Sequence, residues 1–223
     1  MSERRATRLI FVRHGESVVT VNRVIGGRRT CSGLSELGRL QTARLRDRLA
    51  DADLAVDVLL SSDFPRAIET AEILQPALGV AVAAKRFDRL VGFGEHDPGP
   101  DIDGMTFDEY VERFGTPDWV GDPHAEVFPG GETVAQFHDR VGGALDELLD
   151  VHRGRTVVVA CHGGVVDAVF RRLLDQPITG GFELHTLNTS LTEFESLPRG
   201  RWRLARYNDA AHLDGLPSAT TRV

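Results

Sequence analysis

Three short segments of the sequence carry residue types that can bind and transfer a phosphoryl group. Arg13 and His14 directly follow one apolar run, His162 directly follows another, and Arg66 comes a few residues after a third. A neutral imidazole can act as a nucleophile, and guanidinium groups form bidentate, charge-assisted hydrogen bonds with phosphoryl oxygens. Each of these residues alone is more often structural or solvated. The prediction therefore depends on a fold that brings all of them together.

A predicted alternation of strands and helices supplies that fold. Short runs rich in Val, Ile and Phe predict strands at Arg8–Val12, Val56–Ser61, Val80–Ala83, Thr156–Ala160 and Leu191–Glu195, with a sixth candidate at Trp202–Tyr207. The pattern favours an α/β fold in which a mostly parallel central sheet lies between two layers of helices as a three-layer sandwich. Ligands bind at the carboxyl ends of such strands, so three strand ends offer one site.

Apolar periodicity and capping residues predict the helices. Helices are expected from Ser35, from Pro65, from Thr133 to His152 and from near Val165. Thr133 and Gln136 form a capping-box pattern. The expected core positions are Leu37, Leu40, Leu45 and Leu49 in the first helix, Ala67, Ala71, Leu74 and Leu78 in the second, and Val134, Phe137, Val141, Leu145 and Leu148 in the third. The N-terminus of the last helix suits an anion, which makes Gly163 a candidate phosphate contact.

Length and composition indicate one globular domain. The chain has 223 residues, of which 41% are hydrophobic and 26% charged, so residues 1–223 are expected to form a single domain. A net charge of −7 argues against a general nucleic-acid surface. Neither a membrane-spanning run nor a signal-peptide core is apparent, which predicts a cytoplasmic protein. Cys31 and Cys161 do not suggest a disulfide framework.

One segment, residues 95–132, differs from the rest of the chain. It contains eleven acidic residues, a single basic residue and five of the ten prolines. A solvated excursion with one short helix near Thr106–Phe114 is one interpretation of this composition. The other is a lid over the active site, because long insertions in compact domains are often functional.

The motifs occur in an order that resembles the histidine phosphatase superfamily, which includes the cofactor-dependent phosphoglycerate mutases. The resemblance covers nearly the whole chain. The similar segments are residues 9–17 (LIFVRHGES), 34–41 (LSELGRLQ), 61–71 (SSDFPRAIETA), 130–133 (GGET), 161–164 (CHGG) and 188–190 (NTS).

This resemblance implies a phosphoglycerate mutase-like fold and a mechanism. His14 would attack phosphorus and become a phosphohistidine, while Arg13, Arg66 and His162 would hold the phosphoryl oxygens. Neither a metal nor a cofactor is implied, because the arginines carry out the electrostatic task of a metal. Glu16 is expected to be structural. The expected partner is a small phosphorylated substrate, with a homodimer left open.

The general acid is the weakest part of the resemblance. Family members carry a Glu or Asp after the third strand, commonly four residues before a glycine. Pairing Gly92 with that glycine assigns the acid to Asp88, whereas pairing Gly94 with it leaves Glu95 as the nearest carboxylate. Asp97 and Asp103 are further, less favoured candidates for the general acid.

Departures from the mutase pattern favour a phosphatase. Thr20 occupies a position where mutases usually have Asn, and residues 24–34 differ from the mutase loop. Three arginines in this region either contact substrate or form a solvated basic loop: Arg23, Arg28 and Arg29. The acidic segment would also repel a substrate that carries both a carboxylate and a phosphate.

Three other functions stay open beside a phosphatase. The chain could be a phosphoglycerate mutase, or it could bind a phosphorylated ligand without turning it over. A metal hydrolase is a further alternative. Its ligands would be His14, His162, His96 and Asp97, although the chain has no HExxH motif or other closely spaced ligand pair.

Overall fold

A computed structural model describes residues 5–52, 54–80 and 88–217, without the side chains of residues 88–90. Its sheet has five strands in the order β2-β3-β1-β4-β5. The strands are β1 (Arg8–Arg13), β2 (Val58–Ser61), β3 (Thr156–Cys161), β4 (Leu191–Ser196) and β5 (Trp202–Asp209). β2, β3 and β1 are parallel, whereas β4 and β5 add an antiparallel edge. The predicted mostly parallel sheet is confirmed for the part that holds the site.

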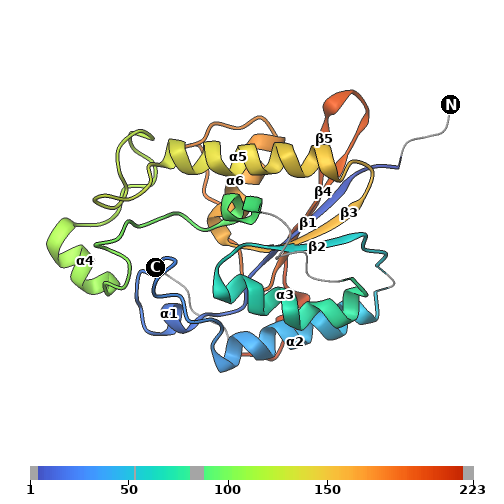
Figure 1. The fold of residues 1–223 in the computed structure, drawn as a ribbon, viewed down its shortest axis with the longest axis horizontal. Coiled ribbons are helices and arrows are strands. Elements are labelled where there is room, and N and C mark those ends of the chain that lie inside the picture. The colour runs from blue at the N-terminus through green and yellow to red at the C-terminus, as the bar shows by residue number, and fades with distance from the viewer. Residues whose placement is uncertain (1–4, 53, 81–87, 218–223) are drawn as a thin grey trace.

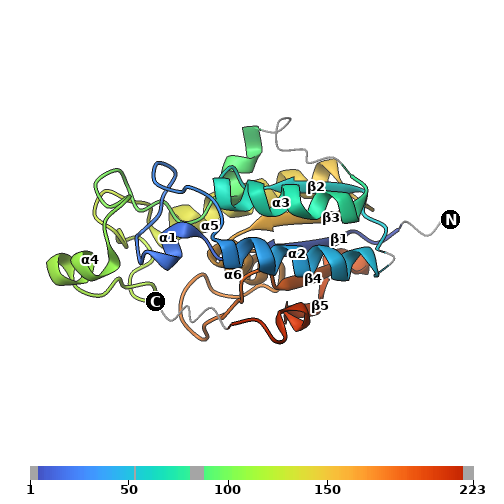
Figure 2. The ribbon, with the colours of Figure 1, turned by 90° about the horizontal axis from the view of Figure 1, so that it is seen from below.

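Helices cover both faces of this sheet. α5 (Val134–Val151) and α6 (Gly163–Leu173) lie on one face, and α2 (Glu36–Ala50) and α3 (Pro65–Leu78) lie on the other, as Figures 1 and 2 show. Successive strand residues point to opposite faces, so Leu9 and Phe11 join one apolar cluster while Ile10 and Val12 join the other. Two cores thus fix β1 from both sides.

The predicted helices form with small shifts at their ends. The Thr133–Gln136 capping box is present at the start of α5, and all the predicted apolar positions of α3 and α5 are buried. α6 begins at Gly163, two residues before the predicted Val165, because His162 is its N-cap. Val80 lies in a bend after α3, and the rest of the predicted strand Val80–Ala83 is outside the described residues.

The predicted core face of α2 is partly wrong. Leu45 and Leu49 are buried as expected, but Leu40 is exposed and Leu37 is only half-buried. Gly38 lies instead on the buried face, where an added Cβ would stand 2.0 Å from the Glu16 carbonyl oxygen. This close approach of α2 to the turn after β1 rotates Leu40 into solvent.

Residues 95–132 project beyond the carboxyl ends of the strands, beside α1 (Val18–Val21) (Figure 1). They follow the 3₁₀ helix η2 (Asp88–Phe93) and contain the predicted short helix as α4 (Phe107–Phe114), capped by the Thr106 side chain. The segment has a small apolar cluster of its own, made of Ile102, Tyr110, Val127, Phe128 and the neighbouring Val134. It is therefore a folded excursion that is acidic outside and apolar inside. Two further 3₁₀ turns, η3 (Pro198–Gly200) and η4 (Ala211–Leu213), flank β5.

Asp103 ties this segment to the loop after α1. Its buried carboxylate accepts hydrogen bonds from the backbone N–H groups of Gly27 and Arg29, both at 2.9 Å, and from the Thr30 hydroxyl. Burial alone would raise the pKa of this carboxyl, but the three donors outweigh it and hold the pKa below its ordinary value. Asp103 is thus fully engaged in structure.

Replacing Asp103 with alanine should lower the free energy of unfolding by about 2–4 kcal/mol, because buried backbone donors lose their acceptor. The native pKa is the depressed one, so this contribution is present above the ordinary Asp pKa and is lost as pH falls through the native value. Urea unfolding at pH 7 and again at acidic pH measures both effects. The exposed Asp101 of the same segment provides the control variant, Asp101→Ala. Equal stability of the two variants at pH 7 would contradict the role of Asp103.

Candidate active site

His14 lies buried at the carboxyl end of β1 with a defined tautomer. Its Nδ1 is 2.6 Å from the Gly15 carbonyl oxygen, which can only accept, so Nδ1 carries the ring proton. Its Nε2 is 3.1 Å from the Nε–H of Arg66 and accepts that hydrogen bond. Nε2 is therefore unprotonated, and its lone pair points toward the guanidinium of Arg66.

The surroundings of His14 keep its ring neutral. Burial makes the largest contribution, and the nearby cations Arg66 and Arg13 add to it, so that the pKa of His14 lies well below its ordinary value of 6.5. A neutral ring at physiological pH is what a nitrogen nucleophile requires.

Two arginines from different elements converge here. Arg66 is the second residue of α3, and its buried guanidinium stacks over the Phe64 ring at 4.7 Å. Arg13 ends β1 and donates from Nη1 to the Thr186 carbonyl, while its Nε is buried without a hydrogen-bond partner among the described residues. Both side chains line the same pocket as His14. Their donors form a cationic site that suits an anion.

His162 lies directly behind His14. The two ring centroids are 5.1 Å apart, and His162 Nε2 is 2.8 Å from the Ser62 hydroxyl. Its Nδ1 is buried and has no hydrogen-bond partner within the described part of the chain. Burial first, and then Arg66, lower the pKa of His162 well below its ordinary value. His162 itself is fully buried and does not line the pocket, in contrast to the glycines that follow it.

Residues from α2 and from two loops pack against the turn after β1 and fix its backbone. A Cβ on Gly15 would come within 2.5 Å of the Gly38 carbonyl oxygen, so the absence of a side chain serves the approach of α2. The Glu16 carboxylate accepts a hydrogen bond from the Ser35 hydroxyl at 2.7 Å. On the opposite side, Asn188 donates from Nδ2 to the His14 carbonyl at 2.9 Å. The LSELG and NTS motifs thus position the backbone of His14.

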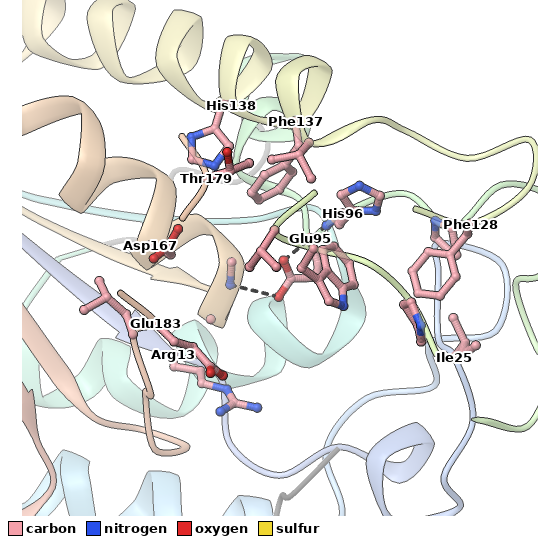
Figure 3. Close-up of a pocket in the computed structure, with 18 of the residues that line it drawn as sticks. Arg13, Ile25, Glu95, His96, Phe128, Phe137, His138, Asp167, Thr179 and Glu183 are labelled. Atoms are coloured by element: carbon pink, nitrogen blue, oxygen red, sulfur yellow. Dashed lines mark hydrogen bonds between the residues drawn. The ribbon is translucent and has the colours of Figure 1, made fainter. Parts of the chain in front are cut away.

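Glu95 reaches the N-terminus of α6. Its Oε2 accepts a hydrogen bond from the backbone N–H of Gly164 at 3.3 Å, drawn as a dashed line in Figure 3. A Cβ on Gly164 would lie 2.4 Å from the other carboxylate oxygen, so the glycine makes room for Glu95. Gly163 and Gly164 also line the pocket. The helix N-terminus therefore contacts a carboxylate, as expected for an anion-binding position.

Arg140 on α5 fixes the loop that carries Glu95. Its guanidinium donates to the carbonyl oxygens of Val91, Gly92 and Gly94 at 3.0–3.2 Å and pairs with Glu132 at 2.7 Å. It also donates to the Glu95 carbonyl at 3.4 Å. Glu132 is the Glu of the GGET motif, so this motif helps to hold Arg140 in place. Arg140 was not predicted as a site residue, because its local sequence carries no motif and its partner Glu132 stands eight residues earlier.

A pocket of about 680 Å³ opens over these groups. Its inner end holds Arg13, His14, Arg66 and Glu95. Two walls extend outward, as Figure 3 shows. One wall is mainly aromatic and aliphatic, with Ile25, His96, Phe128 and Phe137, and the other is polar, with His138, Asp167, Thr179 and Glu183. The site is far larger than a phosphate ion, so it has room for the remainder of a small substrate.

The profile of the histidine phosphatase superfamily (branch 1) matches residues 9–210 of the sequence. The chain belongs to the histidine phosphatase superfamily. The resemblance expected from its motifs is thereby confirmed, and the superfamily match spans all five strands of the sheet.

Relatives of this superfamily member include phosphatases and a mutase-like protein. Phosphoglycerate mutase-like protein 4 of Arabidopsis thaliana is 28% identical over 214 residues, covering 92% of this chain and 86% of the relative. The uncharacterized phosphatase PhoE of Bacillus subtilis (strain 168) is 27% identical over 212 residues, covering 94% and 98%. A solved structure of a mycobacterial glucosyl-3-phosphoglycerate phosphatase with VO3 has 27% identity and a TM-score of 0.74, covering 91% and 99%.

Two of the other carboxylates predicted as candidates for the general acid, those of Asp97 and Asp103, lie outside the pocket lining. Asp97 accepts from the Gly99 N–H at 3.0 Å and Asp103 is engaged by the Gly27–Thr30 loop, and neither residue lines the pocket. Asp88 begins η2, but its side chain lies outside the described residues. Among the predicted acids whose side chains the structure describes, Glu95 is the one that lines the pocket.

The three arginines in and next to residues 24–34, the stretch that differs from the mutase loop, have other partners. Arg23 pairs with Asp108 at 2.7 Å, Arg28 pairs with Asp63, and Arg29 donates to the carbonyl of Pro100 at 3.0 Å. These three arginines do not line the pocket described above. The structure therefore gives no support to the first of the two interpretations, in which these arginines contact substrate in the pocket rather than form a solvated basic loop.

The candidate metal ligands His14, His162, His96 and Asp97 do not form a metal-binding cluster in the described structure. Within residues 5–52, 54–80 and 88–217, no group of three or more His, Cys, Asp or Glu side chains is arranged to hold a metal ion. Cys31 and Cys161 are both free and buried. Over the same described ranges, none of the helices combines the length and apolar character needed to cross a membrane.

Proposed function

We propose that this protein is a phosphomonoesterase that acts through a phosphohistidine formed on His14. One observation carries the proposal. Nε2 of His14 is unprotonated at the inner end of a pocket, because Nδ1–H is donated to Gly15, and Arg66 contacts the same Nε2. A nucleophilic lone pair beside a cation is the arrangement that attack on a phosphorylated anion requires.

In the first step Nε2 of His14 forms a bond to phosphorus while the bond from phosphorus to the ester oxygen breaks. The phosphoryl oxygens lie beside Arg66 and accept hydrogen bonds from its guanidinium and from the guanidinium of Arg13. Gly163 supplies the N-terminus of α6. His162 lies outside the pocket lining, and its unpartnered Nδ1 would reach a phosphoryl oxygen only when phosphate binding brings the two together. The Glu95 carboxylic acid gives its proton to the departing alcohol oxygen.

In the second step water attacks phosphorus on the opposite side and the nitrogen–phosphorus bond breaks. The Glu95 carboxylate now accepts a proton from this water, so the acid of the first step is the base of the second. Inorganic phosphate leaves, and His14 returns to its neutral form with the proton on Nδ1. The two guanidiniums offset the charge of both transition states, so no metal enters the scheme.

Phosphate-ester hydrolysis in excess chelator tests this function. We expect turnover of phenyl phosphate that EDTA does not reduce. Transfer from a bisphosphorylated primer to phosphoglycerate, assayed in parallel, would indicate a mutase instead. Binding of inorganic phosphate without either activity would indicate a non-catalytic binder and would overturn the proposal.

Charge around the pocket favours hydrolysis over mutase activity. A mutase substrate carries a carboxylate besides its phosphate, and this second anion needs its own cation. Besides Arg13 and Arg66, the part of the lining that the structure describes contains one further guanidinium, that of Arg171. Arg171 is already bound to Asp167 at 2.7 Å and to the Pro177 carbonyl at 2.7 Å. The arrangement therefore supports a substrate with one anionic group.

Changing Glu95 to Gln should slow the hydrolysis of esters with poor leaving groups. A well-placed acid contributes about 10²- to 10⁴-fold, so an alkyl phosphate should lose that much kcat/KM. An ester of 4-nitrophenol, whose oxygen leaves without protonation, should lose much less. Measuring both esters for wild type and Glu95→Gln gives the contrast.

Two further variants separate Glu95 from its rivals. Asp97→Asn changes a neighbouring carboxylate outside the pocket lining and should keep both activities. Asp88→Asn changes the other predicted acid. A leaving-group contrast found in Asp88→Asn and absent from Glu95→Gln would transfer the acid role to Asp88.

A further inference from the structure

The outer part of the pocket has an apolar wall built mostly by residues 95–132. Phe128 and Phe137 are buried in it, and Trp119 contributes an indole that packs edge-on against Phe128 at 5.6 Å between ring centroids. Val24 and Ile25 continue the wall from the loop after α1. An aromatic wall next to a phosphoryl site can hold a flat apolar group.

Trp119 is the exposed member of this wall. Its side chain is 45% exposed and the adjacent Val120 is 67% exposed, although both line the pocket. Large apolar side chains left open at the rim of a site gain free energy when a ligand covers them. Their position therefore indicates that part of the ligand is apolar.

His96 places one polar group inside the aromatic wall. Its ring is 8% exposed and lies 4.9 Å from Trp119 and 5.6 Å from Phe137, measured between centroids. Both ring nitrogens are buried and find no hydrogen-bond partner among the residues described. The His96 imidazole therefore contributes to the wall as one more packed ring rather than as an accessible polar group.

The charges beyond the phosphoryl site are acidic. Asp118, Asp167 and Glu183 line the outer pocket. Among the described residues of this lining the one outer cation is Arg171, which is held by Asp167 and by backbone carbonyls. A second anionic group on the ligand would meet carboxylates and no unengaged guanidinium of this lining.

From this wall and these charges we infer the substrate class, an inference that rests on the proposed function. The substrate is a phosphomonoester whose alcohol part is flat and apolar, such as an aryl group, and carries no second anion. Trp119 covers this group and determines the preference. The phosphoryl chemistry at His14 is the same for every ester.

Four aryl esters test the inference with small differences in leaving-group chemistry. These are phenyl, 2-naphthyl, 4-carboxyphenyl and 4-(aminomethyl)phenyl phosphate. In the wild type, kcat/KM for the naphthyl ester should exceed that for the phenyl ester by about tenfold, as an added apolar group in a pocket typically gives. The carboxyphenyl ester should fall about tenfold below the aminomethyl ester. A para carboxylate does not make the phenolate a worse leaving group, so such a deficit reports on binding.

Trp119→Ala should reduce the naphthyl-to-phenyl ratio to near one. The matched control is Phe114→Ala, since Phe114 belongs to the same segment, is also 45% exposed and lies outside the pocket lining. The control should keep the wild-type ratio. Equal kcat/KM for all four esters, or a ratio that survives Trp119→Ala, would overturn the inference.

Binding measured without turnover separates this inference from the proposed function. Calorimetric titration of the His14→Ala variant with the same four esters gives their Kd values. If the wild type hydrolyses none of the esters, the proposed function fails. The order of Kd values then still supports the substrate class if naphthyl binds about tenfold more tightly than phenyl and carboxyphenyl binds most weakly. Equal Kd values would refute it.

Discussion

Replacing His14 with alanine is expected to lower kcat for phenyl phosphate hydrolysis by at least about 10⁴-fold, the scale seen when a covalent nucleophile is removed. The physical reason is the tautomer described above. Nε2 is the atom with a free lone pair, and its neighbour Arg66 cannot take over as a nucleophile because a guanidinium stays protonated. Assays in excess EDTA, with enzyme purified in parallel with wild type, measure the loss.

The control for His14 is an exposed histidine on the segment 95–132. His124→Ala removes an imidazole from the chain without touching the pocket lining, and it should retain wild-type kcat. Acid-labile phosphate should be trapped on wild-type protein after rapid denaturation at alkaline pH and should be absent from His14→Ala. Labelling that persists in the His14→Ala variant would contradict His14 as the phosphorylated residue.

Replacing Arg66 with alanine is expected to lower kcat/KM by about 10³-fold, because a charge-assisted donor to the transferring phosphoryl is lost. Arg66→Lys should recover little, since a lysine does not reproduce the Nε–H that Arg66 donates to His14. The exposed Arg201 offers the matched control Arg201→Ala. Thermal unfolding of each variant checks that the fold is kept, and near-normal kcat/KM in a folded Arg66→Ala variant would remove Arg66 from the mechanism.

The same variant has a second, independent readout in its pH profile. Arg66 is one of the groups, after burial itself, that lower the pKa of His14. Without this cation the His14 pKa rises, and the ring becomes protonated at a higher pH. Because only neutral His14 can attack, the acidic limb of the kcat/KM profile should move upward in pH relative to wild type. An unchanged limb would contradict the electrostatic coupling of the two residues.

Local sequence signals predicted most of the helices and strands that the structure describes, with the strand predicted at Val80–Ala83 as the exception, since Val80 lies in a bend. Each of the helices predicted from Ser35, Pro65 and Thr133 starts within one residue of its predicted position, because side-chain caps and helix-starting prolines act within one turn. The buried face of α2 was less predictable. Leu40 has the same local pattern as its neighbours, and only the contact between Gly38 and the distant Glu16 backbone turns it toward solvent.

The residues of the candidate site likewise include some that local sequence could predict and others that it could not. Arg13 is the last residue of β1 and His14 comes next, so predicting the strand was enough to place both residues at its carboxyl end. Glu95 and Asp88 could not be separated by spacing alone, because the choice depends on how the loop after η2 is held. Arg140 holds that loop from a helix 45 residues further along the chain, through carbonyl groups that any sequence would provide. Such contacts leave no motif.

The two anchors of the segment 95–132 have a consequence for how this enzyme family can diversify. Arg140 secures the first residue of the segment to α5, and Asp103, in the first quarter of the segment, secures it to the loop after α1. The stretch around Trp119 lies between Asp103 and Glu132 and lines the same pocket as His14, but it belongs to a different part of the chain from β1. Mutations can therefore accumulate around Trp119 without displacing the reactive imidazole. Selection for a new ester would act on this stretch, while the inherited chemistry stays intact beneath it.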